Sequence, residues 1–526
     1  MRRAVVLALV SAGLLLASSA SGRVLRVGSF HGVSGQFASI QAAVNAARPG
    51  DWILIGPGDY KTMGSRHPAG RSDRPAGVLV SKARIYIRGM NRNTVIVDGT
   101  KPGSPRCSSR RGDQNFGPHA SKGALGLNGI MVWKAANVWV QNLTACNFLN
   151  GKGSSNGNEI WWNGGDGSGK IGGHAYLGSY LTATTTYFAG ESTAAAYGIF
   201  TSNWTGGVFD QIYASNFNDS DFYIGACRQQ CNQTINHAWG EFSALGYSGS
   251  NSGGRMLIEN SQFDNNEDGF DTNSQNGDNP PPQDGACPPG AKPPVKGAPT
   301  CWVFIHNFVH DNNNANVPSA GAAAAGPVGT GMSVTGGRND TIMNNRFENN
   351  NAWGLILVPF PDSGPPCTGG TLNSPLLGTG SCLYDEWGDA LIGNSFSHNG
   401  GYGNPTNGDF EQLNFEQHPN DCFTGNSSTA GSLSPEAAKL QNANPTCSSR
   451  PVGPNLNIPF LNEVLCDSQV SLPPFGCQPG DHYPRRTRVV MHKLPKHLPT
   501  MPNPCAGVPR NPWCPSGHKG RKPTGY

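Results

Sequence analysis

The sequence predicts an all-β solenoid, a fold in which short strands stack coil upon coil. A glycine followed by a large apolar residue at Gly246 returns 23 residues later at Gly269, and Gly331 and Gly354 have the same spacing. A second repeated motif consists of an aliphatic residue followed by Asn two and seven positions later. It occurs at Val140/Asn142/Asn147, Ile258/Asn260/Asn265, Ile305/Asn307/Asn312, Ile342/Asn344/Asn349 and Ile392/Asn394/Asn399. A fixed period of roughly 20–50 residues indicates units that bury a common core by stacking.

The N-terminal segment has the pattern of a secretory signal peptide. Arg2 and Arg3 precede the apolar residues 5–17, and small residues follow at 18–22. We predict that residues 1–22 are removed on export and that the protein is secreted. Outside this segment the chain has no uncharged apolar run of about 18 residues, so no membrane insertion is expected.

The first regular element after the signal peptide is a predicted helix. Ile40, Ala43 and Val44 have helical spacing, and Ser39 is suited to cap the first turn. The Arg-Pro-Gly-Asp sequence at 48–51 ends the helix, and residues 52–55 begin a strand that the Gly- and Pro-containing residues 56–60 terminate.

Residues 40–60, IQAAVNAARPGDWILIGPGDY, resemble the opening of pectate-lyase-like right-handed parallel β-helix proteins. The resemblance lies in the repeat pattern of the superfamily and matches no specific enzyme family. It implies a right-handed parallel β-helix (solenoid) over residues 29–430, with the N-terminal helix covering the open end of the first coil. Such a cap is physically required, because an open stack exposes core side chains and unpaired strand edges.

Further strands are predicted at residues 78–81, 85–88, 95–97, 129–133 and 137–140. The repeated Asn residues fall where strands give way to turns. Because Asn tolerates left-handed backbone and hydrogen-bonds neighbouring amides, stacked copies are expected to form a ladder along the helix. We therefore interpret the repeated Asn residues as scaffold rather than as a sugar-binding array.

Fourteen cysteines indicate an oxidising compartment. The simplest arrangement is seven disulfides between sequence neighbours, although the sequence does not fix the connectivity. The seven pairs are Cys107/Cys146, Cys227/Cys231, Cys287/Cys301, Cys367/Cys382, Cys422/Cys447, Cys466/Cys477 and Cys505/Cys514. A zinc site at Cys227 and Cys231 is the weaker alternative, because no second close pair accompanies them.

The C-terminal region, residues 431–526, is Pro/Cys-rich, basic and expected to be partly disordered. Residues 481–526 contain nine Lys or Arg and one Asp, whereas the whole chain has a formal charge of only +4. So few apolar residues do not favour independent folding. The segment is either a solvated extension or a contact with anionic polymer or cell wall.

The densest polar cluster lies at residues 264–271. Its closely spaced carboxylates are the hard oxygen ligands that Ca²⁺ prefers, and the predicted metal ligands are Asp264, Glu267, Asp268 and Asp271. The segment 268–271 is similar to the acidic segment of calcium-dependent pectate lyases. That resemblance implies a calcium ion that neutralises a uronate carboxylate, with Asp268 and Asp271 in the site. Solvated turn acids are the alternative interpretation.

A lyase also needs a base, and here the sequence departs from the lyase pattern. No Lys or Arg follows Asp271 closely, and Lys292 and Lys296 lie in a Pro-rich insertion. Arg255, in the preceding predicted strand, is the remaining candidate for the catalytic base beside Asp268 and Asp271.

Paired carboxylates also support glycoside hydrolysis. If the 23-residue registers stack, Asp271 shares one face with Ser248 and Ser333, and the candidate substrate-binding aromatic residues Tyr223, Phe200 and Trp133 lie farther along it. Aromatic residues at strand spacing are also frequent in cores. The Gly-rich runs contain no GxGxxG turn between a predicted strand and a helix, which disfavours nucleotide binding, and no nucleic-acid partner is expected.

These observations predict a secreted, monomeric β-helix protein that acts on or binds an acidic polysaccharide, as a lyase with calcium. Two alternatives remain: a non-catalytic protein that binds extracellular glycan or cell wall, and a glycoside hydrolase with paired carboxylates.

Overall fold

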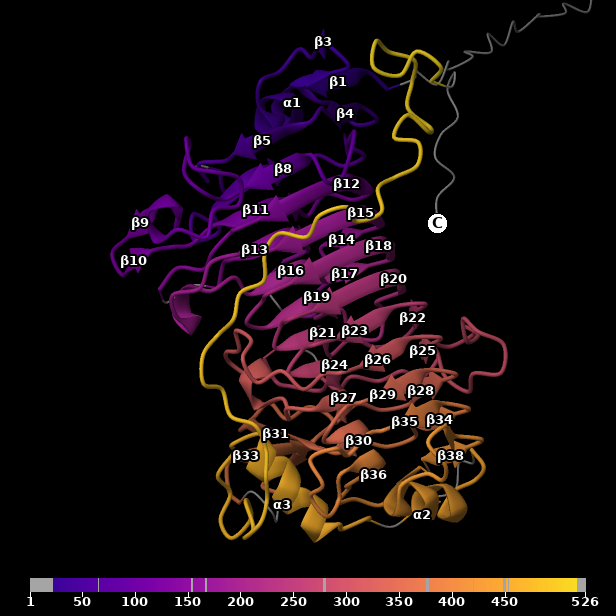
Figure 1. Ribbon diagram of the computed structural model, residues 1–526. Coiled ribbons are helices and arrows are strands. Elements are labelled where there is room, and N and C mark those ends of the chain that lie inside the picture. Colours follow the sequence, from indigo (N-terminus) through magenta and orange to yellow (C-terminus); the bar gives the residue numbers. More distant parts are fainter. Residues whose placement is uncertain are drawn as a thin grey trace, which may run out of the picture.

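A computed structural model describes residues 22–64, 66–152, 155–165, 168–277, 281–374, 378–419, 421–447, 451–452 and 454–517. The chain folds as a right-handed parallel β-helix, as predicted, with coils stacked along one axis (Figure 1). The predicted signal peptide lies outside the described residues except for Gly22.

One side of the solenoid is a ten-stranded parallel sheet. Parallel pairing places the same position of successive coils side by side; for example, Phe222 pairs with Tyr247 in the next coil. From the N-terminal end, its strands are β6 (Ala76–Val80), β11 (Asn128–Trp133), β13 (Asn158–Asn163), β16 (Tyr197–Ser202), β19 (Ser220–Gly225), β21 (Leu245–Ser250), β24 (Asp268–Asn273), β27 (Thr330–Thr335), β30 (Trp353–Val358) and β36 (Gly408–Gln412).

The other sides form a 19-stranded sheet that is bent into two rows. The long strands β12 (Val138–Cys146), β15 (Tyr176–Thr184), β18 (Gly207–Ser215) and β20 (Gln233–Glu241) belong to both rows. The first row adds β1 (Val24–Val27), β4 (Trp52–Ile55), β7 (Tyr86–Gly89), β22 (Met256–Glu259), β25 (Trp302–Ile305), β28 (Asp340–Met343), β34 (Ala390–Ile392) and β38 (Cys422–Thr424). The second row adds β5 (Gly58–Lys61), β8 (Val95–Asp98), β23 (Gln262–Asp264), β26 (Phe308–His310), β29 (Arg346–Glu348), β35 (Ser395–Ser397) and β39 (Ser427–Ser428).

Short elements decorate the loops between coils. They are β2 (Ser29–Phe30), β3 (Val33–Ser34), β9 (His119–Ala120), β10 (Gly123–Ala124), β14 (Gly173–His174), β17 (Trp204–Thr205), β31 (Phe360–Ser363), β32 (Thr371–Leu372), β33 (Ser381–Tyr384), β37 (His418–Pro419), β40 (Pro451–Val452) and the 3-10 turns Arg111–Asp113, Glu191–Thr193 and Ala323–Ala325.

The predicted N-terminal helix is confirmed as α1 (Ile40–Ala46). Ala42 N donates a hydrogen bond to Ser39 Oγ at 3.3 Å, so Ser39 is the N-cap. Ile40, Ala43 and Val44 are buried in the main core, which closes the first coil against water.

Large aromatic side chains fill the interior of the central coils. Tyr247 and Phe270 stack with ring centroids 4.2 Å apart, and Phe263 meets Phe270 edge to face at 5.4 Å. All three are fully buried. The glycine that precedes each inward aromatic residue is sterically required, because a Cβ at Gly246 or Gly269 would lie 2.4 or 2.5 Å from the backbone of the next coil.

The predicted Asn ladders are confirmed at two corners of the solenoid. At one corner Asn345 N donates to Asn394 Oδ1 at 3.0 Å, and Asn345 Nδ2 donates to Phe304 O at 2.9 Å. Asn394 repeats this arrangement with Asn426. Each amide thus satisfies a donor in one coil and an acceptor in another, which joins successive coils.

The ladder register predicted from the sequence was wrong in three of the five repeats. Asn142 and Asn147, Asn260 and Asn265, and Asn344 and Asn349 have left-handed backbone, with φ between 51° and 59°. In the second and third of these repeats the ladder positions are one residue later, at Ser261, Asn266, Asn345 and Asn350. Each of these corners has two consecutive residues, the first with left-handed backbone and the second with a side chain or backbone amide in the ladder. Asn suits both positions, so the recurrence of Asn alone does not show which position a given Asn occupies.

All seven predicted disulfides are present. Cys227 and Cys231 are bonded to each other, which rules out the zinc alternative at this pair. Each bridge spans 39 residues or fewer, so the bridges fasten loops and turns to neighbouring coils.

Two helices follow the last stacked strand. α2 (Pro435–Ala443) covers the last coil, where Ala437 joins the main core and Gln441 Oε1 accepts from Asn426 N at 2.9 Å. α3 (Ile458–Asp467) lies beside the ten-stranded sheet, and its Phe460 packs edge to face on Trp353.

The basic C-terminal segment, expected to be a solvated extension or a contact with anionic polymer, lies along the solenoid. Residues 484–517, here named the C-terminal strap, run from the last coils back to the first (Figure 1). The His492 ring stacks on Phe242 with centroids 3.4 Å apart, and Leu498 N donates to Asn93 Oδ1 at 3.1 Å. Trp513 Nε1 donates to Val33 O at 2.9 Å. Corner residues of the coils thus provide polar partners for a strap with few apolar side chains.

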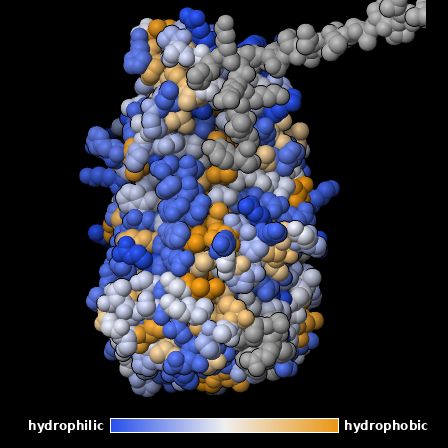
Figure 2. All heavy atoms as spheres, turned by 90° about the vertical axis from the view of Figure 1, so that its right-hand side faces the viewer, coloured by the Kyte–Doolittle hydropathy of each residue, from blue (hydrophilic) through white to orange (hydrophobic). Residues whose placement is uncertain are grey.

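The solvent-facing side that contains β22, β25 and β28 has a mixed surface. Figure 2 shows hydrophilic side chains over most of this face and hydrophobic atoms gathered near its middle. Within the described part of the chain, no helix has both the length and the apolar character needed to cross a membrane.

Candidate functional site

The strand register of the ten-stranded sheet places one outward residue per coil in a continuous column. Phe200 pairs with Tyr223, Tyr223 with Ser248, Ser248 with Asp271, and Asp271 with Ser333. The prediction that these residues share one face is therefore confirmed, whereas Trp133 pairs with Asn163 and lies outside the column, which continues from Phe200 to Trp161. The column changes from aromatic to polar between Tyr223 and Ser248.

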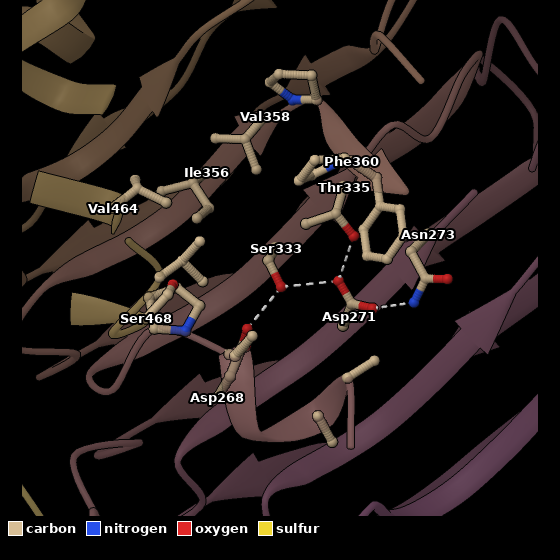
Figure 3. A pocket seen from close by; sticks show the side chains of 18 of the residues that line it. Asp268, Asp271, Asn273, Ser333, Thr335, Ile356, Val358, Phe360, Val464 and Ser468 are labelled. Atoms are coloured by element: carbon tan, nitrogen blue, oxygen red, sulfur yellow. Dashed lines mark hydrogen bonds between the residues drawn. The ribbon is translucent and has the colours of Figure 1, made fainter. Parts of the chain in front are cut away.

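A cavity of about 450 Å³ lies over the polar part of the column. Its floor is the outward face of β21, β24 and β27, and α3 and the loop at residues 322–327 form its walls. Figure 3 shows Val464 of α3 and Ile356 and Val358 of β30 on one side, with Asp268 and Asp271 at the floor. An apolar wall therefore stands opposite a polar floor.

A single hydroxyl joins the two carboxyl groups of the floor. Ser333 Oγ lies 2.6 Å from Asp268 Oδ2 and 3.0 Å from Asp271 Oδ1 (Figure 3). One hydroxyl carries one proton, so it donates to one carboxylate at a time. The arrangement is fully hydrogen-bonded when Asp268 is protonated and donates to Ser333 Oγ, which then donates to Asp271.

The surroundings of the two carboxyls differ. Thr335 Oγ1 donates to Asp271 Oδ1 at 2.7 Å, and Asn273 Nδ2 donates to Asp271 Oδ2. These bonds stabilise the ionised form of Asp271. Asp268 has Ser333 and, at 3.2 Å, the Phe270 N–H.

Burial is the main influence on both acids. It raises the pKa of Asp268 well above its usual value, and the nearby charge of Asp271 raises it further. Burial also raises the pKa of Asp271, while its three hydrogen-bond donors act in the opposite direction. The pair therefore favours a protonated Asp268 beside an ionised Asp271.

The residues present do not fit the predicted calcium site. Asp264 lies on β23 in the second row, where its carboxylate accepts from Trp239 Nε1 at 2.8 Å. Glu267 follows the ladder corner, away from the cavity lining, and burial raises its pKa to about 8. Among the described residues, no three of Asp264, Glu267, Asp268 and Asp271 bring ligand atoms within 4.8 Å of one another. The corner at Asn266 turns the chain between Asp264 and Asp268, so their sequence proximity does not bring them together.

The predicted base, Arg255, does not line the cavity either. It immediately precedes β22 in the first row, whereas Asp268 and Asp271 belong to the ten-stranded sheet. The described lining residues of the cavity include no Lys, Arg or His.

The predicted substrate-binding aromatic residues lie outside the cavity. Phe200 is 5% and Tyr223 4% exposed, and the Phe200 ring stacks on Trp161 with centroids 4.8 Å apart. Trp133 is partly buried, with Lys134 Nζ 5.2 Å from its ring centroid. These side chains pack against one another as a satellite cluster and present no open aromatic platform.

Sequence reasoning missed the wall of the cavity. Leu461, Val464 and Leu465 project from α3, about 190 residues beyond Asp271. Their spacing of three and four residues is a helical signal that marks an apolar face. It does not indicate which coil that face covers.

Comparisons with solved structures find likenesses at low sequence identity. No protein-family model and no curated protein matches the chain. The A-module of mannuronan C-5 epimerase AlgE6 from Azotobacter vinelandii is 12% identical over 74% of this chain and 94% of its own, with a TM-score of 0.42. A family 28 exopolygalacturonase from Yersinia enterocolitica is 11% identical over 77% of this chain and 75% of its own, with a TM-score of 0.41. The pectate lyase Pel9A is 13% identical over 79% of this chain and 82% of its own, with a TM-score of 0.33. The β-helix assignment rests on the strand pairings described above.

Proposed function

We propose that the protein is a secreted glycoside hydrolase that cleaves a polysaccharide with Asp268 and Asp271. The observation that carries this proposal is the pair of buried carboxyls joined through Ser333 at the floor of the cavity. Two carboxyls in different states at one site are what glycosidic bond hydrolysis requires. The predicted signal peptide and the seven disulfides support export.

In this mechanism Asp268 donates its proton to the oxygen of the leaving sugar. Asp271 attacks the anomeric carbon as the bond to the leaving oxygen breaks, which forms a covalent glycosyl ester. A water molecule that gives one proton to Asp268 then attacks the same carbon, which releases the sugar and Asp271. Asp268 Oδ2 and Asp271 Oδ1 both contact one hydroxyl, at 2.6 and 3.0 Å, so they are closer than the roughly 6.5–9.5 Å of inverting enzymes. We therefore expect retention of anomeric configuration.

The cavity favours a hydrolase over the predicted calcium-dependent lyase. Proton abstraction beside a uronate needs a base and a cation that neutralises the uronate carboxylate. The described lining has no cationic side chain, and the four acids do not fit a calcium ion. The cavity is lined by three carboxyls, of Asp219, Asp268 and Asp271, and by no cationic side chain among the described lining residues. These carboxyls disfavour an anionic sugar, so an uncharged glycan segment suits this site better.

The test is product analysis on a panel of neutral and uronate-containing polysaccharides. A hydrolase releases reducing ends without ultraviolet absorbance of unsaturated uronides, and Asp271→Asn abolishes the release. Asp264→Asn is the matched control, because it lies in the same stretch but outside the cavity and should leave the activity unchanged. Unsaturated products that disappear with chelator would instead establish a lyase. Retention of a glycan in affinity electrophoresis without turnover would favour a binding protein.

A further inference from the structure

A second group of buried acids lies in the last coils, apart from the cavity. Glu386, Asp389 and Asp421 are 0%, 0% and 1% exposed. One carboxylate oxygen from each lies within 4.8 Å of the other two. Asp389 and Asp421 immediately precede β34 and β38 in the first row, and Glu386 lies in the loop that leads to Asp389.

Two of these acids belong to a ladder at a third corner of the solenoid. Asp340 N donates to Asp389 Oδ1 at 2.7 Å, and Asp389 N donates to Asp421 Oδ1 at 2.7 Å. Asn performs the same task at the other two corners. There its Nδ2 also donates to a backbone carbonyl, as Asn394 Nδ2 does to Ile342 O at 2.9 Å. An aspartate lacks that donor, so this ladder accumulates negative charge.

The neighbouring donors leave one oxygen of Glu386 and one of Asp389 without a partner. Gln412 Nε2 donates to Glu386 Oε1 at 3.1 Å and also to Asp421 Oδ2, and Asn414 Nδ2 donates to Glu386 Oε1 at 3.3 Å. Glu386 Oε2 and Asp389 Oδ2 are fully buried and have no hydrogen-bond donor. Within the described residues, no Lys, Arg or His forms an ion pair with Glu386 or Asp389. Buried carboxylates without donors or countercharge are strongly unfavourable, so Glu386 and Asp389 require neutralisation, which either a proton or a bound cation provides.

We propose that Glu386, Asp389 and Asp421 bind one hard divalent cation, of which Ca²⁺ is the best fit. Carboxylate oxygens are the ligands that such ions prefer, and Ca²⁺ accepts irregular coordination with additional amide oxygens. A half-turn of the Gln412 amide would present its oxygen to the same ion. The ion would join the loop at Glu386 to two successive coils, at Asp389 before β34 and Asp421 before β38.

This proposal is independent of the hydrolase and is tested on the full-length protein with metal analysis. Protein folded in calcium-containing medium and then gel-filtered should retain about one Ca²⁺ per chain by mass spectrometry. Removing the ion with chelator should lower Tm by on the order of 5 °C, and added Ca²⁺ should restore it.

Asp389→Asn separates binding from folding. The new amide keeps the acceptor for Asp340 N–H and adds the donor that the Asn ladders use, so the variant should fold. It should bind Ca²⁺ at least tenfold more weakly and lose the Tm response to chelator, as should Glu386→Gln. Asp340→Asn is the control: it occupies the same ladder one coil earlier, outside the three-oxygen group, and should keep the ion. The proposal is overturned if the wild-type protein holds no divalent metal and its Tm does not change with chelator. It is also overturned if Asp340→Asn loses the ion as completely as Asp389→Asn.

Discussion

The two halves of the outward column on the ten-stranded sheet share a backbone but differ in chemistry. Toward the N-terminal end, Phe200 and Tyr223 pack with Trp161 into a closed cluster. Toward the C-terminal end, Asp271 and Ser333 occupy the same register beneath a cavity. The repeat thus creates equivalent positions in successive coils. The size of the side chain at each position, and the later segments such as α3 that pack over it, decide which positions can bind a ligand.

The largest effect is expected on catalysis, from the polar half of the column that contains Asp271 and the neighbouring Asp268. Asp268→Asn removes the proposed proton donor and should lower the rate of polysaccharide hydrolysis about 1,000-fold. Aryl glycosides with good leaving groups need little protonation, so the kcat/KM of the variant for them should stay near the wild-type value. Steady-state kinetics on both substrate classes test this, and an equal loss on both would contradict the acid role of Asp268.

In the aromatic half the expected effect is on stability. Phe200 is buried against Trp161 and Tyr197, with ring centroids 4.8 and 4.7 Å away. Phe200→Ala should lower the free energy of unfolding by about 4 kcal/mol, because it leaves a cavity in a packed cluster. Chemical denaturation measures the loss, and Phe200→Leu should lose less. A substrate KM that rises with Phe200→Ala at unchanged stability would instead restore the predicted binding role of the aromatic residues.

Beside the polar half, Glu267 makes stability depend on pH. Burial raises its pKa from 4.5 to about 8, so the folded state holds this proton more tightly than the unfolded state. The contribution of the group is most favourable below about pH 4.5 and is lost as the pH rises through about 8. Glu267→Gln should remove this loss and stabilise the protein at pH 9 relative to the wild type, on the order of 3 kcal/mol. Denaturation of both proteins at pH 5 and pH 9 tests the sign of this effect. An equal decrease in the free energy of unfolding of the wild type and Glu267→Gln between the two pH values would contradict it.

The smallest effect is expected at the hydroxyl that joins the two acids. Ser333→Ala removes the bridge but neither carboxyl, so hydrolysis should fall about tenfold, as for one lost hydrogen bond to a charged group. The acidic limb of the pH–rate profile should move, because Asp271 loses a donor that favours its ionised form. Ser248→Ala, two coils from Ser333 in the same column, should leave the profile unchanged. A shift of similar size there would point to a general packing effect.

The fold could be predicted because its signals are local and repeated. Ser39 and the helix that it caps, the inward glycines and the corner Asn residues are each recognised from a few neighbouring residues. The glycine and Asn signals also recur from coil to coil. The exact ladder position could not be predicted, since Asn344 and Asn345 suit either corner role.

The candidate site could be predicted only in part. Asp268 and Asp271 fall on one strand, so their shared location follows from the sequence. Asp264 appears equally close, yet a corner separates its strand from theirs. The wall at Val464 and the strap contacts at His492 depend on tertiary packing between segments hundreds of residues apart, which no local pattern encodes.

The C-terminal strap has a consequence for how the solenoid unfolds. In a simple stack each coil contacts only its neighbours, so the ends can fray independently. Here Trp513 bonds to Val33 across 480 residues of sequence, and Arg486 pairs with Glu191 midway. The strap therefore couples the first coils to the last ones, so unfolding at one end destabilises the other. We expect the solenoid to unfold in a more cooperative transition than a stack without the strap.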